Sequence, residues 1–599
     1  MRKQRLRFFQ ARLFNASMAE IVYRLREQLL LRTLRYWPCA LARPESPPQV
    51  NDHHVQALAF PRLEGEVNPD EVEAILNGRR YSLHEDVQSI SDFEKRFQST
   101  YFTNISLDQD DPDIRAVWEP GRLQHLTVLM HALQHGYESV TGKDLQAAVK
   151  ADLLNWIEAN PFLHGVHYLS VMECGLRIPV FVLALQALKT LSPQEREAIL
   201  QILYEHGWIV HKRLSLYSST GNHTVAECLG LVMAGGVFKG SKNGSKWLAA
   251  GIELLEQESC HQILNDGGPV EQSFAYHRFV LDCFWLAVGF LEGNSLHDCS
   301  RLKARLQRGE LFLHAQQQAH GQLPQFGDSD DGCALAPGLA PERDLPDGGQ
   351  EQNRVLTFAE SGYSIFTSQD GVALTFDHGP LGMAPLYNHG HADALSVVVS
   401  RNGLPFLIDP GTYRYNGRPH ERAYFKSTRA HNTVTVDGQD QAEQVTGFIW
   451  DHPYDVQWGR LVGPGGSSTI TASHNGFERL EEPVTHSRSV TFEENGTIEI
   501  EDRFSGSGEH VFELNVHLHP EVRVHENSGG LWLVHGQERV HISFGGSSHE
   551  LVSKRDEPML GWSSFNYGIM QPTTVLLVRQ GGHVEDVTFT TVITAGPHE

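Results

Sequence analysis

The chain is poor in cysteine and in positive charge, and both shortages narrow its possible functions. Its 599 residues include seven cysteines, which are scattered and form no Cys-x-x-Cys pair. A disulfide framework is therefore not expected, and the thiols fit a reducing compartment. Acidic residues outnumber Lys and Arg by 73 to 49, which gives a formal net charge of -24. That balance argues against a general nucleic-acid-binding protein, because such a protein needs a basic face.

A long apolar run is also missing. The most apolar later stretch, residues 279–291, is interrupted by Asp282 and is too short to cross a bilayer. The basic first residues are not followed by a continuous apolar segment or a clear small-residue cleavage site, so they do not resemble a secretory signal. We therefore expect no transmembrane span and a cytoplasmic location.

Residues 1–43 differ from the rest of the chain in charge. They contain ten Lys or Arg and two Glu, a net charge of about +8. Within them, residues 19–37 are basic and amphipathic, with leucines placed among arginines. We expect a helix that packs on the protein's own acidic body. The alternative is a helix that rests on an anionic membrane surface, which would make the protein a peripheral membrane protein.

The middle of the chain has a helical pattern. After a Pro-rich loop at residues 44–69, apolar residues recur at helical spacing from 114 to 318. Ser192-Pro193-Gln194-Glu195 is typical of a helix start, with an N-cap, a Pro and a Glu in the first turn. Residues 327–353 are dense in Gly, Pro and Asp, which indicates a connection between domains.

Beyond that connection the apolar period changes to two, which is typical of strands. Three dipeptides follow or separate such runs and favour hairpins: Asn402-Gly403, Asp437-Gly438 and Asn495-Gly496. With no convincing long helix after them, these runs predict an antiparallel β domain, with a sandwich as its architecture. The expected organisation is a basic helix and linker over residues 1–68, a helical domain over 69–353 and the β domain over 354–599.

Two clusters in the helical part can carry chemistry. Asn222 and His223 fall in or next to the first turn of a helix capped by Thr220 or Asn222, where the helix dipole favours a bound carboxylate. A Gly-rich turn at residues 265–268 leads into a helix that bears Tyr276. The alternatives are a plain capping segment with a surface His and a buried core Tyr with a satisfied hydroxyl.

A third cluster lies in the β part and can bind a metal. His391, Asp409 and His431 offer two nitrogens and one oxygen, which suits zinc. Pairing across Asn402-Gly403 brings the start of one strand to the end of the next, and so places His391 close to Asp409.

Together these clusters resemble the heparinase II/III-like polysaccharide lyases, a superfamily that includes alginate lyases and other glycosaminoglycan lyases. The most specific parts are NHGHADALSVVVSRNGLPFLIDPGTY and STRAHNTVTVDG. The resemblance implies an α + β multidomain fold, an N-terminal (α/α) toroid (an incomplete barrel) followed by a C-terminal antiparallel β-sandwich. It also implies one structural zinc per chain, which braces the loop that presents a catalytic His. The implied catalytic residues are Asn222, His223, Tyr276 and His389. The implied zinc ligands are His391, Asp409 and His431.

The implied reaction is a β-elimination, which removes the C5 proton of a uronate and expels the sugar linked at O4. Because that proton is weakly acidic, the site must first neutralise the carboxylate. Asn222 is the expected donor, with His223 beside it. Tyr276 is the expected proton relay, with its pKa lowered from about 10 by nearby imidazolium or Arg charge. His389 is the base when the proton lies on the opposite face, or a second carboxylate donor.

The expected partner is an anionic polysaccharide or oligosaccharide. The sequence does not distinguish among the possible substrates, which are heparan sulfate or heparin, hyaluronan, chondroitin, alginate and a bacterial exopolysaccharide. For substrate contacts we expect Glu227, Glu271, Arg278 and Arg414. Recognition of a sulfate group needs Arg or Lys near the cleft. The alternative is that the basic residues belong to a solvated loop and bind no substrate. The other candidates for sulfate contacts are Arg418, Arg422 and Lys426.

Three other functions are compatible with the sequence. An (α/α)-barrel glycoside hydrolase needs two opposed carboxylates, for which Glu227, Glu271 and Asp266 are available. A glycan-binding or assembly protein of an exopolysaccharide pathway would bind the polymer without cutting it. A metallo-hydrolase would use the zinc directly and needs an open ligand position.

Overall fold

The computed structural model describes residues 17–596, except 37–43, 45, 85, 108–110, 138, 141–142, 319–320, 346–354, 464–466 and 494. The predicted boundary between residues 353 and 354 lies outside the described residues, as does the predicted end of the amphipathic stretch at Trp37. The exact domain limits therefore stay a prediction.

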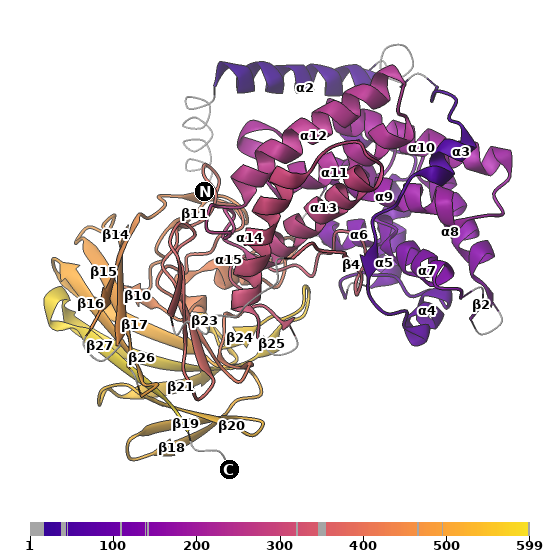
Figure 1. Ribbon diagram of the computed structural model, residues 1–599. Helices are drawn as coiled ribbons and strands as arrows, with labels where there is room; N and C mark the ends of the chain where they lie inside the picture. The colour runs from indigo at the N-terminus through magenta and orange to yellow at the C-terminus, as the bar shows by residue number, and fades with distance from the viewer. Residues whose placement is uncertain are drawn as a thin grey trace.

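The first half of the chain folds into α-helices (Figure 1). As predicted, Ser192 caps α10, and Ser192 and Glu195 form a capping box with Pro193 in the first turn. The bounds of the helices are α2 Met18–Tyr36, α3 Asp52–Ala57, α4 Pro69–Leu76, α5 Val87–Phe97, α6 Ile114–Gly121, α7 Gln124–Gln134, α8 Leu145–Ala159, α9 Val171–Ala187, α10 Pro193–Lys212, α11 Asn222–Val237, α12 Lys242–Gln262, α13 Phe274–Gly293 and α14 Ser300–Gln316.

Helices α9 and α11 form the centre of this half and are buried over nearly their whole length. Two glycines let their backbones touch. A Cβ on Gly175 would lie 2.8 Å from the carbonyl oxygen of Ala226, and one on Gly230 would lie 2.8 Å from the carbonyl oxygen of Gly175. This dense packing fixes the N-terminal end of α11, where Asn222 lies.

The second half is built from antiparallel strands, with α15 (Pro419–Lys426) among them (Figure 1). The larger sheets have the strand orders β5-β6-β7-β8-β9, β10-β17-β26-β21 and β13-β14-β15-β16-β27-β20-β19-β18. Their bounds are β5 Val355–Phe358, β6 Tyr363–Thr367, β7 Val372–Asp377, β8 Val397–Arg401, β9 Leu404–Leu407, β10 Val434–Val436, β13 Val456–Val462, β14 Ser468–Phe477, β15 Val484–Phe492, β16 Ile498–Gly506, β17 Glu509–His517, β18 Arg523–Asn527, β19 Gly530–His535, β20 Glu538–Ser543, β21 His549–Ser553, β26 Thr574–His583 and β27 Thr588–Ala595.

Short strand pairs complete the structure. They are β1 Leu63–Glu64 with β4 Ala340–Pro341, β2 Ser139–Val140 with β3 Lys143–Asp144, β11 Glu443–Gln444 with β12 Trp450–Asp451, β22 Arg555–Asp556 with β23 Met559–Leu560, and β24 Trp562–Ser563 with β25 Gln571–Pro572.

Two of the three predicted hairpins are confirmed. Asn402-Gly403 joins β8 to β9, and Asn495-Gly496 lies between β15 and β16, which pair along their whole length. The prediction for Asp437-Gly438 is wrong. A turn forms there, but β10 pairs with β17 much later in the chain (Val434 opposite Leu514). The dipeptide therefore set a local turn, and the strand partner was chosen by tertiary packing.

Aromatic side chains join the two halves beside α13. The ring of Tyr363 on β6 lies 5.0 Å from that of Phe274 and 5.5 Å from that of Phe326, centroid to centroid. Such contacts stabilise the boundary and fix the first turn of α13 against the β half. Among the described residues, α13 alone is long and apolar enough to cross a membrane, and 72% of its most apolar window is buried inside the protein. That burial is typical of a core helix.

Candidate active site

Three of the four residues expected to be catalytic meet where the two halves face each other. Asn222 begins α11, Tyr276 lies in the first turn of α13, and His389 lies in the loop between β7 and β8. Asn222 Nδ2 is 3.3 Å from His389 Nε2, and the rings of Tyr276 and His389 stack with centroids 3.9 Å apart. We call Asn222, Tyr276 and His389 the boundary cluster, because each half of the protein contributes to it.

A carboxylate of the protein itself holds Asn222. Glu271 accepts hydrogen bonds from the Asn222 backbone N–H (3.2 Å) and from its amide Nδ2 (3.1 Å). Gly221 is the N-cap of α11, and a Cβ there would lie 2.5 Å from Glu271 Oε1. The prediction that Thr220 or Asn222 caps this helix is therefore wrong. The place expected for a substrate carboxylate at the end of the helix is taken by Glu271.

Asp328 determines which nitrogen of His389 can accept a proton. Asp328 Oδ2 is 3.1 Å from His389 Nδ1, and Arg422 Nη2 donates to the same carboxylate at 2.9 Å. Burial alone would raise the pKa of Asp328, but the Arg422 guanidinium holds this pKa well below its usual range. Because a carboxylate only accepts hydrogen bonds, Nδ1 of a neutral His389 carries the hydrogen, and Nε2 presents its lone pair toward Asn222.

The hydroxyl of Tyr276 is held by Asp330 and Tyr415. It is 3.0 Å from Asp330 Oδ2 and 3.0 Å from the Tyr415 hydroxyl. Burial and the charges of Asp330 and Asp328 raise the pKa of Tyr276 well above its usual value. The prediction that positive charge lowers this pKa is therefore wrong, because the nearby Arg115 is paired with Asp330 (Nε to Oδ2, 3.1 Å). At neutral pH Tyr276 is a phenol.

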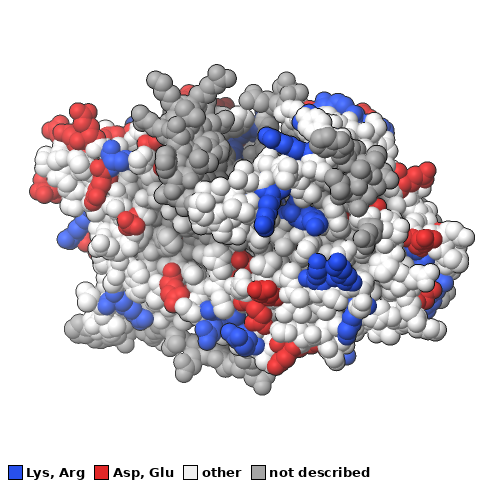
Figure 2. All heavy atoms as spheres, turned by 90° about the horizontal axis from the view of Figure 1, so that it is seen from above, with Lys and Arg blue, Asp and Glu red and all other residues white. Residues whose placement is uncertain are grey.

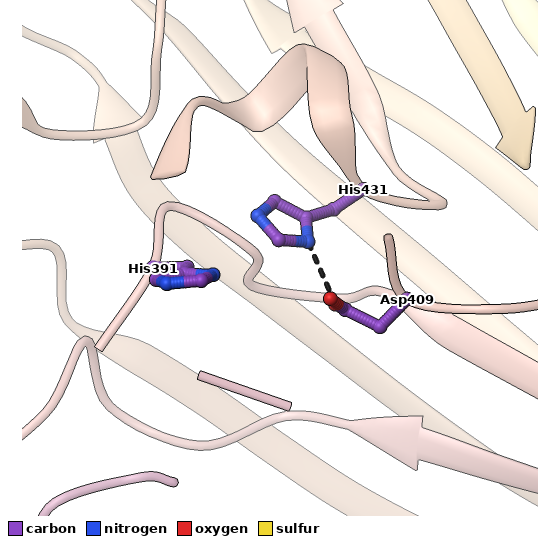
Figure 3. Close-up of side chains that lie close together, drawn as sticks. All are labelled: His391, Asp409 and His431. Atoms are coloured by element: carbon purple, nitrogen blue, oxygen red, sulfur yellow. Dashed lines mark hydrogen bonds and ion pairs between the residues drawn. The ribbon is translucent and has the colours of Figure 1, made fainter. Parts of the chain in front are cut away.

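His391, Asp409 and His431 converge within the β half (Figure 3). We call them the metal cluster; they are buried, and their ligand atoms lie within 4.8 Å of one another. His431 Nδ1 is 2.7 Å from Asp409 Oδ2, while His391 Nδ1 is buried without a hydrogen-bond partner. Two imidazoles and a carboxylate are a donor set that zinc prefers, and a buried nitrogen without a partner fits a bound cation.

Comparison with known families identifies both halves of the chain. The description "Heparinase II/III N-terminus" matches residues 122–333, and "Heparinase II/III-like, C-terminal" matches residues 351–592. The chain belongs to the heparinase II/III-like family. Among solved structures, heparinase III has a TM-score of 0.66 at 17% identity, over 96% of this chain and 90% of that one. A heparan sulfate lyase from Pedobacter heparinus has a TM-score of 0.53 at 16% identity, over 89% and 88% of the two chains.

These likenesses confirm the predicted fold, an (α/α) toroid followed by an antiparallel β-sandwich. Curated relatives are the heparin-sulfate lyases of Bacteroides stercoris, 22% identical over 387 residues, and of Bacteroides thetaiotaomicron, 21% identical over 342 residues. The matches cover 59% and 50% of this chain, and 54% and 47% of the two relatives. The heparinase II/III-like chain thus spans about half the length of the curated relatives it matches.

His223, the fourth residue expected to be catalytic, is exposed between buried neighbours at the start of α11. Although water reaches its ring, the surrounding protein partly desolvates it. That desolvation, together with the adjacent His389, lowers the pKa of His223 to about 4. His223 is therefore a neutral imidazole at neutral pH, with a surface open to a ligand.

Two acidic residues expected in the site have other roles. Glu227 is fully buried and accepts hydrogen bonds from the backbone N–H and the hydroxyl of Ser215, both at 2.7 Å. Its proposed contact with substrate is wrong, because its oxygens lie in the helical core. Glu271 reaches the site, but it is buried and its oxygens bind Asn222.

Asp266, the third carboxylate considered for a hydrolase, accepts backbone hydrogen bonds from Gly268, Glu360 and Ser361 at 3.1, 2.7 and 2.8 Å. It therefore links the turn before α13 to the β half. None of the three carboxylates expected for a hydrolase is left to activate a water molecule, since each binds groups of the protein.

Two of the basic residues considered for sulfate binding are part of the core. Arg422 pairs with Asp328, and Lys426 is fully buried with its Nζ 3.1 Å from the carbonyl oxygen of Gly447. The prediction that these two residues bind sulfate is therefore wrong, and so is the alternative that they lie in a solvated loop, because α15 packs them inside the β half. Burial lowers the pKa of Lys426 well below its usual value.

The remaining basic candidates have different neighbours. Arg418 is exposed and lies 3.8 Å from Glu421, and Arg414 is half-buried with its guanidinium carbon 5.5 Å from the ring centroid of Tyr413. Arg278 lines a cavity of about 500 Å³ between the two halves, together with His519 and Phe565. The boundary cluster does not line that cavity, so a contact of Arg278 with the scissile sugar stays a prediction.

Sequence reasoning missed the two carboxylates that organise the boundary cluster. Asp328 and Asp330 lie in the segment that was interpreted as a simple connection between domains. The available signal was the run Gly-Asp-Ser-Asp-Asp at residues 327–331, where three carboxylates follow a glycine. Asp328 also contacts His391 Nε2 at 3.0 Å, so one carboxylate touches both the boundary cluster and the metal cluster.

Proposed function

We propose that this chain is a polysaccharide lyase that cleaves a uronic-acid-containing glycosaminoglycan of the heparin or heparan sulfate type by β-elimination. The observation that carries the proposal is the boundary cluster, in which an amide, a phenol and an imidazole from two domains lie within contact distance. Family membership and the heparin-sulfate lyase names of the curated relatives support the same chemistry.

In this proposal Asn222 and His223 receive the carboxylate of the uronate. The Asn222 amide donates to His389 over a long contact of 3.3 Å, which a substrate oxygen can replace. A hydrogen bond from a positioned donor strengthens as charge moves into the carboxylate when the C5 proton leaves. His223 adds an exposed imidazole ring beside the Asn222 amide. Glu271 holds the amide in place through the helix end.

The proton transfers are divided between His389 and Tyr276. His389 is the base, because Asp328 fixes the hydrogen on Nδ1, so Nε2 can accept the C5 proton once the substrate replaces its 3.3 Å contact with Asn222. Tyr276 is the acid that protonates the leaving O4 oxygen, because its raised pKa keeps the phenol protonated. Asp330 and Tyr415 orient this hydroxyl, and the stacked rings keep the two groups side by side.

We further propose that the metal cluster holds one structural zinc. His391, Asp409 and His431 would be its ligands, and Asp328 would orient the His391 ring through Nε2. When bound, the ion adds a fixed positive charge and cross-links the loops that carry these residues. In this arrangement zinc supports His389 through Asp328, without contact to the substrate.

The test is a panel of purified heparan sulfate, heparin, chondroitin sulfate, hyaluronan and alginate. Elimination creates a C4–C5 double bond, so we expect ultraviolet absorbance to rise together with shorter products on heparan sulfate or heparin. Shorter products without the chromophore would support a glycoside hydrolase. Binding at constant polymer length, unchanged in Tyr276→Phe, would support a glycan-binding protein. Either result would reject the lyase proposal.

A further inference from the structure

Helix α2 (Met18–Tyr36) has an inner face that is bound firmly to the toroid. The hydroxyl of Tyr23 donates to the carbonyl oxygen of Leu214, and Arg24 Nη2 donates to Ser219 Oγ at 2.7 Å. Both acidic residues of the helix also point inward. Glu20 accepts from the Ser218 hydroxyl, and Glu27 lies 3.8 Å from Arg213. The helix is therefore part of the folded body and contacts the segment that leads to Asn222.

The outer face of α2 carries an apolar stripe that no described residue covers. Met18, Val22, Leu25, Leu29 and Tyr36 are 75, 42, 64, 67 and 64% exposed. They are spaced by three, four or seven residues and so lie on one side of the helix. At a rise of about 1.5 Å per residue the stripe is roughly 27 Å long. Single exposed apolar residues are common, but a continuous stripe indicates an interaction surface.

The charges beside the stripe have one sign. Arg26, Arg32 and Arg35 are exposed, while the acidic residues of the helix are turned to the body. Figure 2 looks down on the face that α2 crosses, where blue side chains lie near the middle and red ones lie below them. An apolar stripe with arginines along it is the pattern of a helix that lies in the interface of an anionic bilayer.

From these observations we propose that the outer face of α2 docks the protein on an anionic lipid bilayer. The apolar side chains would enter the boundary between headgroups and acyl chains, and the three arginines would pair with anionic headgroups. Charge repulsion from the acidic body is screened beyond about 8 Å at physiological ionic strength. The inner face keeps its contacts with residues 213–219, so docking requires no rearrangement of the site. The inference does not depend on lyase activity.

A second copy of the chain is a poorer occupant of the stripe. Two α2 helices packed stripe to stripe would bring Arg26, Arg32 and Arg35 of one copy against the same residues of the other. Like charges at such a seam are destabilising, and no acidic side chain of α2 is on that face to compensate. An anionic surface satisfies both the apolar residues and the arginines.

The test is sedimentation of the full chain with phosphatidylcholine vesicles that either contain or lack phosphatidylglycerol. We expect binding to the anionic vesicles, weakening as salt rises, and little binding to the neutral ones. The double variant Leu25→Glu/Leu29→Glu should bind at least about tenfold more weakly. Arg26→Gln/Arg32→Gln/Arg35→Gln should lose about 10- to 100-fold on anionic vesicles.

The matched control is Leu461→Glu/Val462→Glu on β13, which changes two apolar residues that are 73 and 71% exposed elsewhere. It should bind like the wild type, and an unchanged unfolding midpoint should show that each variant folds. Residues 1–16 contain five Lys or Arg and no acidic residue, and they remain unchanged in all variants. Equal binding of wild type and Leu25→Glu/Leu29→Glu would overturn the proposal. So would no binding at low salt, or a dimer in analytical ultracentrifugation that the double variant dissociates.

Discussion

The boundary cluster and the metal cluster use the same residue types but leave their polar atoms in different states. In the boundary cluster, the Asn222 amide nitrogen, the Tyr276 hydroxyl and both His389 nitrogens have protein partners. Of the polar side-chain atoms of these three residues, Asn222 Oδ1 alone is buried without a partner, and the neighbouring His223 is exposed. In the metal cluster all three residues are buried, and one nitrogen each of His391 and His431 has no partner.

This difference indicates two kinds of ligand. A site for a substrate that binds and leaves must remain stable while empty, so most of its polar groups need partners within the protein. A site for a permanent ion needs no such partners, because the ion supplies them. Asp328 connects the two sites, since its two oxygens contact His389 and His391.

Tyr276→Phe tests the boundary cluster most strongly. The variant keeps the ring that stacks on His389 but removes the hydroxyl held by Asp330 and Tyr415. If this phenol protonates the leaving oxygen, kcat should fall by about 10²- to 10⁴-fold with a similar unfolding midpoint. Initial rates of double-bond formation measure the effect.

Tyr204→Phe is the matched control for that variant. Tyr204 is a buried tyrosine of the helical half whose hydroxyl accepts a hydrogen bond from Asn243 at 2.7 Å. Its loss should leave kcat unchanged. If Tyr276→Phe kept most of its activity, the phenol would have no role in proton transfer.

Asp328→Asn tests whether the two clusters are coupled. The amide cannot hold both imidazoles and the Arg422 guanidinium as the carboxylate does. Loss of such an orienting group typically lowers activity or metal affinity by about 10- to 100-fold. We therefore expect both kcat and zinc affinity to fall, measured by initial rates and by competition with a fluorescent chelator.

Asp502→Asn separates this coupling from a general loss of stability. Asp502 is buried in the β half and binds Arg488 Nη2 at 3.0 Å and His486 Nε2 at 2.7 Å. It thus repeats the Arg–Asp–His arrangement without a direct contact to either cluster, although Arg488 Nη1 also donates to the carbonyl oxygen of Asn432, next to His431, at 2.7 Å. The control should lower the unfolding midpoint without changing kcat per folded molecule, and it should lower zinc affinity less than Asp328→Asn does. Equal effects of the two variants would contradict a special role of Asp328.

A local pattern predicted that His391 and Asp409 of the metal cluster lie close together, whereas no local pattern placed His431. The Asn402-Gly403 hairpin, confirmed between β8 and β9, is what carries Asp409 back toward His391. The helix start at Ser192 was readable for the same reason, since a capping box involves only four consecutive residues.

The organisation of the boundary cluster was not readable. Asp328 reaches His389 across 61 residues, and Asp330 reaches Tyr276 across 54. Nothing local distinguishes these carboxylates from those of a solvated linker. The raised pKa of Tyr276 and the capture of Asn222 by Glu271 follow from such long-range contacts. Sequence therefore predicted which residues meet, but neither their protonation nor their partners.

Zinc removal tests the metal cluster. With zinc at about 100 times its dissociation constant, binding adds about 2.7 kcal/mol to the folded state, so chelation should lower the unfolding midpoint by roughly 5 to 10 °C. The boundary cluster keeps its own partners, so kcat should change less than in Tyr276→Phe and Asp328→Asn. Calorimetry with and without chelator measures the shift.

Site-specific variants locate the ion. His391→Ala should make the midpoint insensitive to chelator, whereas His378→Ala, at a buried histidine bound to Ser364, should remain sensitive. The described residues hold one other group of similar composition, His519, Glu521 and His535. A chelator response that survives in His391→Ala and is lost in His535→Ala would place the ion there instead.

Glu227→Gln should have the smallest effect on kcat, because Glu227 lies outside both clusters. Burial raises the pKa of Glu227 to about 8, above the value of about 4.3 expected in the unfolded chain. Its proton therefore stabilises the fold fully at low pH, and this contribution is lost as pH rises through about 8. Glutamine does not titrate. Between about pH 5 and pH 9, the variant should gain stability relative to wild type by on the order of a few kcal/mol.

Denaturant unfolding at several pH values measures that gain. The amide can add a constant offset, since Ser215 offers two donors to this side chain, but an offset does not change with pH. Glu253→Gln, at an exposed position of α12, is the matched control and should follow the wild-type pH dependence. A stability difference between Glu227→Gln and wild type that stays constant with pH would mean that Glu227 titrates normally. In that case the helical core would admit water at Ser215.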